Sequence, residues 1–271
     1  MTDKTISQIL AEMGVAGARL DHLAACEAGA GNISICTSQK FDLAQEFPET
    51  KIDVELPWQV PALAGYTVFV TGSGCRLRDV AADPKALVSA FVVDEGGKTA
   101  TWHTHPSRKF ERPTSEFNSH LAVHDDQVRN RKLNYQAVIH AQPPYLVSLS
   151  HIAQLRESTA FNHAIMRWEP ETLVQVPRGI AVLDFMVPGS QELMENNVKA
   201  LRDHQIVLWS KHGVMVRADD EAMSAVDKIE YLEAGAMYEY HNKTIGDAGE
   251  GLSDDEIKAV IEAFGIKTDL Y

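Results

Sequence analysis

The chain has 271 residues, and its 45% hydrophobic and 23% charged residues are typical of a soluble globular protein. Its net charge of −13 argues against a nucleic-acid partner, because a protein that binds a phosphate backbone needs a basic face. No apolar run reaches the roughly 18 residues that a membrane-spanning helix needs, and the first residues show no signal-peptide core. The three cysteines form no CxxC pair, so we expect a reduced, cytoplasmic protein without a membrane partner.

The first part of the chain predicts a helix followed by strands. Apolar residues at helical spacing predict a helix over residues 5–27, which GAGN ends before a strand at ISI. Residues 38–64 are polar, contain several prolines and show no clear period, so we interpret them as a long excursion. A strand over residues 66–70 stops at TGSG, and residues 87–102 indicate a hairpin that turns at a Gly-Gly pair.

The rest of the chain predicts helices mixed with strands and a second hairpin. The expected elements are a helix over 113–130, a strand ending at His140, a helical stretch to about 167, strands at 172–177 and 180–185, a helix over 190–203, a hairpin over 206–218, and helices over 221–243 and 253–264. No repeat or change in composition divides the chain, so we expect a single domain over residues 1–271. We predict a three-layer α/β fold, in which helices cover both faces of a central, mainly antiparallel sheet.

Three loops have the composition of an anion site, namely GAGN (residues 29–32), TGSG (71–74) and PTSE (113–116). Small residues let backbone N–H groups approach an anion, and a helix that begins at Ser115 would direct its positive end toward the same place. Each loop is also compatible with an ordinary turn or helix start. The side chains that could add donors are Asn32, Ser73, Thr114 and Ser115.

Acidic and imidazole side chains offer several further possibilities. Glu116 falls in the first turn of the helix after PTSE, where it can either interact with the helix dipole or act as a general acid or base. The histidines form three possible metal sets, and periodicity does not choose among them or exclude purely structural roles. These sets are His103 with His105, Glu116 with His120 and His124 on one helix face, and His140 with His212 at two distant strand or turn ends.

The chain resembles the class II aldolase/adducin family. The resemblance extends from about residue 5 to 265, and its order, spacing and length are most similar to the rhamnulose branch. It is carried by GAGNIS, VTGSGCRLRD, RPTSEF, VIHAQP, WEPETLVQVPRG, FMVPGS and LWSKHGVMV, in this order. The resemblance implies a metal-dependent aldolase that cleaves a ketose 1-phosphate similar to rhamnulose 1-phosphate into dihydroxyacetone phosphate and an aldehyde. It also implies a cyclic homotetramer with its sites at subunit interfaces.

The resemblance further implies a role for individual residues. Glu116 matches the catalytic glutamate, and Glu171 matches a further glutamate near the site. His140 and His212 match the first and last of three zinc-binding histidines, and Gln142 takes the place of the second. The phosphate-binding positions correspond to Gly31, Asn32, Ser73, Gly74, Thr114 and Ser115. The remaining candidate histidines (His103, His105, His120 and His124) do not match ligand positions, so we expect them to be structural.

Two departures from the family pattern keep other functions open. Gly29 stands where the family's phosphate loop begins with asparagine, and Gln142 offers a neutral amide oxygen, which binds zinc less well than an imidazole does. We therefore expect zinc, with manganese or magnesium as competitors. The alternatives are an enzyme of this family that acts on another sugar phosphate or sugar acid, and a non-catalytic binding or scaffold protein similar to adducin.

Overall fold

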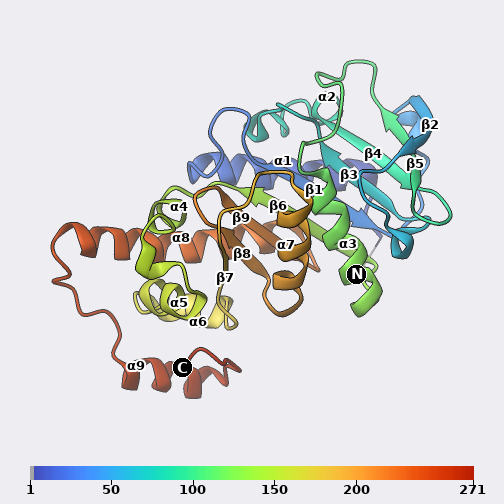
Figure 1. The fold of residues 1–271 in the computed structure, drawn as a ribbon. Coiled ribbons are helices and arrows are strands. Elements are labelled where there is room, and N and C mark those ends of the chain that lie inside the picture. Colours follow the sequence, from blue (N-terminus) through green and yellow to red (C-terminus); the bar gives the residue numbers. More distant parts are fainter. Residues whose placement is uncertain (1–2) are drawn as a thin grey trace.

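The strands of residues 3–271, the part of the chain that this computed structural model describes, form one nine-stranded sheet (Figure 1). They are β1 (Asn32–Thr37), β2 (Glu49–Glu55), β3 (Thr67–Thr71), β4 (Val88–Val93), β5 (Thr99–Thr104), β6 (Tyr135–Ala141), β7 (Ala181–Leu183), β8 (Ile206–Trp209) and β9 (Gly213–Ala218). Their order across the sheet is β2-β5-β4-β3-β1-β6-β9-β8-β7. Only the pair β7 and β8 is parallel within the described residues, which confirms the mainly antiparallel sheet.

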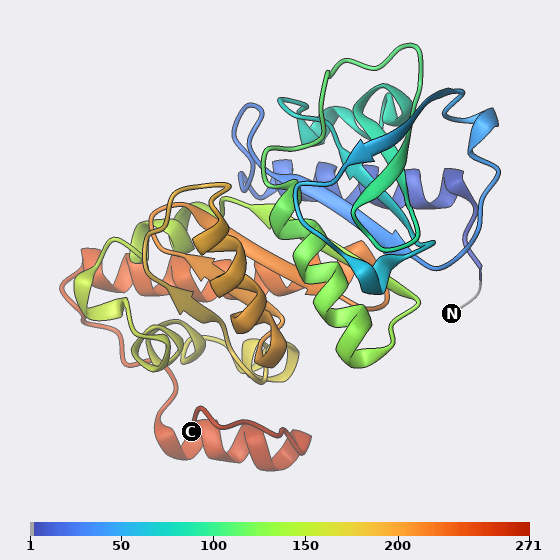
Figure 2. The same cartoon turned by 45° about the vertical axis from the view of Figure 1, so that its right-hand side comes forward.

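Helices cover both faces of this sheet, so the three-layer α/β fold is confirmed (Figures 1 and 2). On one face, α1 (Ile6–His22), α4 (Pro144–Leu149), α5 (Ser158–Met166) and α8 (Ala222–Thr244) share an apolar core with the sheet. On the other face lie α3 (Phe117–Arg131) and α7 (Gln191–Asp203). The shorter or peripheral helices are η1 (Leu43–Gln45), η2 (Pro61–Leu63), η3 (Leu77–Asp79), α2 (Pro84–Leu87), η4 (Ala153–Leu155), α6 (Pro170–Gln175) and α9 (Asp254–Phe264).

Alternation along β6 decides which residues face the site. Ile139 packs into the core with α1 and α8, whereas Val138 packs with α7 on the opposite face. Because side chains alternate along a strand, His140 shares the face of Val138 and lies on the side of α3 and α7. Asn32 pairs directly with His140 across β1 and β6, so the two side chains lie side by side at the same edge of the sheet.

Several expected elements are confirmed by the structure. The hairpins β4–β5 and β8–β9 are present, and Ser253 begins α9 with the expected capping box, in which Glu256 is the partner. The first helix is shorter than expected and ends at His22, because Ala24 takes a positive φ of 54° and interrupts it. The loop after α1 then carries GAGN to the edge of the sheet.

Two sequence interpretations were wrong. The excursion over residues 38–64 contains β2, an edge strand paired with β5, whose side chains are almost all exposed and therefore show no apolar alternation. Residues 172–177 were expected to be a strand because of their β-branched residues, but most of them belong to helix α6. Burial recurs there at Thr172, Leu173 and Val176, which is helical spacing, and Pro170 stands in the first turn of the helix, where it is well tolerated.

Two further observations concern the expected cellular setting. Across residues 3–271 we find no helix with the length and apolar character needed to cross a membrane. Cys26, Cys36 and Cys75 are all free and buried.

Candidate active site

A cavity of about 210 Å³ opens at the edge of the sheet where β1 begins and β6 ends. It joins the glycine-rich loops, the start of α3, the end of β6 and the β8–β9 turn. The residues that line it are Gly29, Ala30, Gly31, Asn32, Gly72, Ser73, Gly74, Thr114, Ser115, Glu116, His140, Gln142, Pro188 and His212. The structure therefore brings together all the site residues expected from the sequence except Glu171.

Backbone contacts hold the loops of this cavity in place. Gly72 forms a β-bridge with Pro113, Ser73 N donates to Arg112 O at 2.9 Å, and Thr114 N donates to Thr71 O at 3.1 Å. The GAGN loop lies against the TGSG loop so closely that a Cβ on Gly29 would be 3.1 Å from Gly74 O. A small residue at position 29 is therefore compatible with this packing, although it lacks the side-chain amide of the family pattern.

Glu116 lies between two imidazoles. Its Oε2 is 3.6 Å from His140 Nε2, and its Oε1 is 3.5 Å from His212 Nε2. Glu116 is 5% exposed and His140 is 2% exposed, so these groups are largely removed from water. Glu116 is the N-cap residue of α3 and not part of its first turn, because the helix begins at Phe117 and not at Ser115 as expected.

The spacing of these three groups fits a divalent ion. Their ligand atoms all lie within 4.8 Å of one another. In a tetrahedral site with metal–ligand bonds of about 2.0–2.1 Å, two ligand atoms are about 3.3 Å apart. The two Glu116 oxygens lie 3.6 and 3.5 Å from the nitrogens of His140 and His212, which is close to that value. Two imidazole nitrogens and one carboxylate oxygen are also a set that zinc favours. Glu116, His140 and His212 could therefore hold a metal ion.

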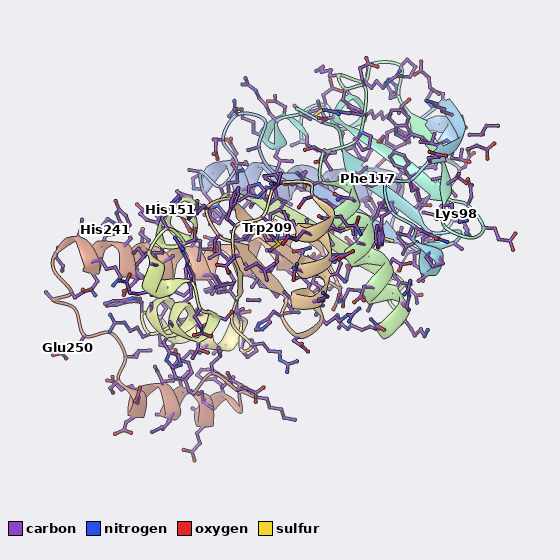
Figure 3. The ribbon with its side chains drawn as sticks, in the orientation of Figure 1. Lys98, Phe117, His151, Trp209, His241 and Glu250 are labelled. Carbon is purple, nitrogen blue, oxygen red and sulfur yellow. The ribbon has the colours of Figure 1, made fainter. Side chains whose placement is uncertain are left out.

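The surroundings of the two histidines are compatible with a role as metal ligands. His140 Nδ1 donates to Val214 O at 2.9 Å, which leaves the lone pair of Nε2 free on the side of Glu116. Trp209, labelled in Figure 3, stacks on the His140 ring with a centroid distance of 4.8 Å. Burial, and then the neighbouring His140, lower the pKa of His212 to about 4 against the opposing effect of Glu116, so His212 is neutral at pH 7.

Gly213 is needed for the approach of β9 to β6. A Cβ on Gly213 would lie 2.4 Å from Ala141 O and 2.8 Å from His140 Cε1, so no side chain fits there without displacing β6 or His140. Lys211, at the same turn, takes a positive φ of 65°. The turn Lys211-His212-Gly213 expected from the sequence thus places His212 opposite the end of β6.

Gln142 lines the cavity beside His140, as expected from strand alternation. With its amide oriented to satisfy its neighbours, the nitrogen of Gln142 donates to both carboxylate oxygens of Glu27, at 2.8 and 3.1 Å. The amide oxygen is then the end of Gln142 that is free for a cation. The sequence interpretation missed Glu27, because it lies on an irregular loop and no motif marks it.

Glu171 is the site candidate that the structure does not bring to this cavity. It is exposed in the first turn of α6, because the residues after it form that helix and not a strand leading to the site. The other histidine candidates also lie elsewhere. His103 and His105 are partly exposed on and after β5, where His103 contacts Thr50 and His105 contacts Ser107.

Replacing His103 and His105 together with Asn should leave bound metal unchanged, because neither side chain lines the cavity. Metal content per chain, measured on protein purified without chelator, checks this expectation. His140→Ala is the comparison and should lose the ion. If the double variant lost the metal and His140→Ala kept it, the ion would be held by His103 and His105 and not by His140.

His120 and His124 are fully buried under α3 and lie outside the metal group. Burial lowers the pKa of His124 from 6.5 to about 4, although a hydrogen bond to Gln136 opposes this effect. Burial, followed by the charges of His124 and His140, also lowers the pKa of His120. Both rings are therefore neutral at pH 7, and both resist protonation while the protein is folded.

Acid should destabilise the protein through His124. Between pH 6.5 and about 4, the unfolded chain binds a proton at His124 and the folded protein does not. The free energy of unfolding should therefore fall as the pH falls through this range, by on the order of 3 kcal/mol for this residue. Urea unfolding of His124→Gln at several pH values should give a shallower dependence. The exposed His151→Gln is the control, and equal slopes in the His124 variant and the parent would contradict the assignment.

Comparisons with known proteins agree with this architecture. The family model described as Class II Aldolase and Adducin N-terminal domain matches residues 11–240. A rhamnulose-1-phosphate aldolase of Bacteroides thetaiotaomicron is 29% identical over 246 residues, covering 89% of this chain and 88% of that protein. One from Escherichia fergusonii is 28% identical over 216 residues, covering 79% and 77%.

Solved structures give the same result. A sugar-phosphate aldolase from Thermotoga maritima has a TM-score of 0.74 and 26% identity, covering 89% of this chain and 97% of that one. An L-fuculose 1-phosphate aldolase, at 22% identity and a TM-score of 0.57 over 96% and 97% of the two chains, supports the fold. The chain belongs to the class II aldolase and adducin family, and within it to the aldehyde-lyases.

Proposed function

We propose that this protein is a divalent-metal-dependent aldolase that cleaves a ketose 1-phosphate similar to rhamnulose 1-phosphate into dihydroxyacetone phosphate and an aldehyde. The observation that carries the proposal is the group formed by Glu116, His140 and His212 inside a cavity walled by three small-residue loops. The names of the relatives support the substrate class, since two of them are rhamnulose-1-phosphate aldolases.

The loops are suited to a phosphate group. Gly31 and Gly74 line the cavity and have positive φ angles of 79° and 75°, a backbone conformation that strains residues with a side chain. Their lack of a side chain would let backbone N–H groups approach an anion closely. The hydroxyl groups of Ser73, Thr114 and Ser115 can add hydrogen bonds. We propose that these groups hold the phosphate and so fix the ketose relative to Glu116, which removes much of the entropic cost of reaction.

His140 and His212 would hold the metal, with Gln142 or Glu116 completing the protein ligands. When bound, a divalent ion supplies positive charge that stabilises the oxyanion developing on the ketose as the carbon–carbon bond breaks. Among residues 3–271, those that line the cavity include no lysine, so the chain offers no amine there for a Schiff base. Zinc fits the imidazole ligands best, and Gln142 makes manganese and magnesium competitors.

Glu116 is the proposed general acid and base. Cleavage between C3 and C4 takes a proton from the C4 hydroxyl and delivers one to C3, the carbon that leaves as part of dihydroxyacetone phosphate. We propose that the Glu116 carboxylate takes up the proton from the C4 hydroxyl and, once protonated, gives it to C3, because this side chain is buried in the cavity and is held by Asn32 Nδ2 at 3.0 Å. In the synthetic direction the same carboxylate would remove that proton.

We also propose that the chain forms a cyclic homotetramer with this cavity at a subunit interface, as the resemblance implies. Phe185 and Val187 are 55% and 65% exposed, and they lie just before Pro188, which lines the cavity. This segment offers apolar surface for such a contact. A role for Glu171 depends on this assembly, because Glu171 of one chain does not line that chain's own cavity.

Metal analysis followed by a retro-aldol assay tests the proposed function. Protein purified without chelator is analysed for zinc, manganese and magnesium, and then assayed with rhamnulose 1-phosphate and other ketose 1-phosphates. Release of dihydroxyacetone phosphate from rhamnulose 1-phosphate is the expected result. Cleavage of another ketose 1-phosphate instead would show that the protein is an enzyme of this family with a different substrate. A metal-loaded protein that is inactive on the whole panel would favour a binding or scaffold role.

A further inference from the structure

A row of buried polar side chains runs from Glu116 away from the cavity, between α3 and the sheet. Its members are Asn32 and Ser34 on β1, His120 and His124 on α3, and Gln136 on β6. Asn32 is 6% exposed, and the other members are completely buried. Apolar side chains would fill this layer at least as well, so the row calls for an explanation beyond packing.

The members of the row contact one another in sequence. Asn32 Nδ2 donates to Glu116 Oε2 at 3.0 Å, and Asn32 Oδ1 is hydrogen-bonded to His120 Nε2. Ser34 Oγ lies 2.7 Å from His120 Nδ1 and 2.7 Å from His124 Nε2. Beyond them, His124 Nδ1 is 2.9 Å from Gln136 Oε1, and Gln136 donates to Asp219.

The direction of these hydrogen bonds is set from the Glu116 end. A carboxylate accepts only, so Asn32 must present its NH₂ group to Glu116 and its oxygen to His120. His120 is neutral and therefore carries its hydrogen on Nε2, which leaves Nδ1 to accept from the hydroxyl of Ser34. The order set from Glu116 ends at Ser34. Beyond it, Gln136 donates to Asp219 and presents Oε1 to His124 Nδ1, so the single ring hydrogen of a neutral His124 can go either to Gln136 Oε1 or to Ser34 Oγ.

Glu116 depends on this order for its own position. Within the described residues, Asn32 is the one hydrogen-bond partner of the Glu116 side chain, and Glu116 makes no side-chain bond to cap α3. If the Asn32 amide turned over, its oxygen would face the carboxylate and repel it. The Nε2 hydrogen of His120 prevents this, because it needs the amide oxygen on its own side.

We infer that His120 is a positioning residue that acts through Asn32 to fix the orientation of the Glu116 carboxylate. This inference rests on the proposed function, in which Glu116 transfers the proton. The amides at positions 32 and 136 do not relay protons under ordinary conditions. The row therefore orients the side chains that it joins and does not transfer protons. Ser34 supports His120 from behind, because its hydroxyl donates to Nδ1 and so leaves the ring hydrogen on Nε2.

A matched pair of substitutions separates positioning from packing. Glutamine can place its amide nitrogen near the position of a histidine Nε2, whereas asparagine can place it only near Nδ1. His120→Gln therefore can keep the donor to Asn32, and His120→Asn loses it, although both replace the same buried ring with an amide. Gln127→Ala is the control, since Gln127 is buried on the same helix and bonds Leu201 O outside the row.

We expect His120→Asn to lower kcat by about tenfold or more, with a small change in KM, whereas His120→Gln keeps most of the parental kcat. Gln127→Ala should lose thermal stability without losing kcat. Once Asn32 is replaced by Ala, His120→Asn should cost little further activity, because the two residues act in one chain of contacts. Equal kcat losses in the Gln and Asn variants, or full additivity with Asn32→Ala, would overturn the inference.

Crystal structures of the two variants test the position of the Glu116 carboxylate directly, without an activity assay. Glu116 Oε2 should stay within hydrogen-bond distance of Asn32 Nδ2 in His120→Gln and move away in His120→Asn. An unmoved Glu116 in both variants would disprove the positioning role. Loss of the proposed function would instead be seen as an inactive parent protein, so the two failures are distinguishable.

Discussion

Replacing Glu116 with Gln should lower turnover by at least about a hundredfold, the usual scale for loss of a general acid or base. The substitution keeps the size of the side chain and leaves an oxygen that can accept from Asn32, so the fold should be unchanged. It removes the carboxylate that we propose exchanges a proton with the substrate. Retro-aldol turnover under saturating substrate is the measurement.

Metal content must be measured on the same Glu116→Gln protein, because this carboxylate lies 3.5 and 3.6 Å from the two imidazoles. We expect the ion to remain, since His140 and His212 are intact and Gln142 is adjacent. A variant that keeps both its metal and its full turnover would remove Glu116 from the mechanism.

Replacing Gln142 with His should raise the affinity for zinc by something on the order of 10–100-fold, the range that even outer contacts of a metal site produce. Position 142 lines the cavity with His140, and an imidazole there would add the ligand that zinc prefers over an amide oxygen. Competitive zinc titration of the parent and the variant gives the two dissociation constants.

A second variant shows whether the amide of Gln142 is oriented by its neighbour. Glu27→Gln removes the carboxylate that accepts from Gln142 and should weaken zinc binding in the parent background. Equal zinc affinity in the parent and Gln142→His would mean that position 142 does not face the ion. In that case, the amide of Gln142 would serve only to bond Glu27 in the loop before β1.

The loops and side chains of the candidate site could be located in the sequence because each is a short motif at a strand end or helix start, and their proposed roles came from the family resemblance. GAGN, TGSG and PTSE specify their own turns, and the pair His140 and Gln142 follows from strand alternation. What brings them together is long-range pairing, such as Asn32 with His140, and no local pattern encodes that register. The choice among the three histidine sets accordingly needed the family resemblance.

The errors have a common physical origin. Edge strand β2 carries exposed, polar side chains, and helix α6 carries β-branched ones, so in both places tertiary contacts outweigh local propensity. The row behind Glu116 was also hidden from the sequence. His120 and His124 stand at helical spacing from Glu116, which suggests a ligand face, and only the position of Ser34 beneath them shows that they bond to the sheet.

The ligand group joins three distant parts of the chain, at the start of α3, the end of β6 and the β8–β9 turn. While the protein is being synthesised, a nascent chain that has not yet reached His212 lacks one of these ligands. The three side chains of this group can therefore meet only after β9 has paired with β6. An ion bound by this group would stabilise the folded chain relative to the unfolded chain. The metal concentration in the cell would then affect how much of the protein escapes degradation.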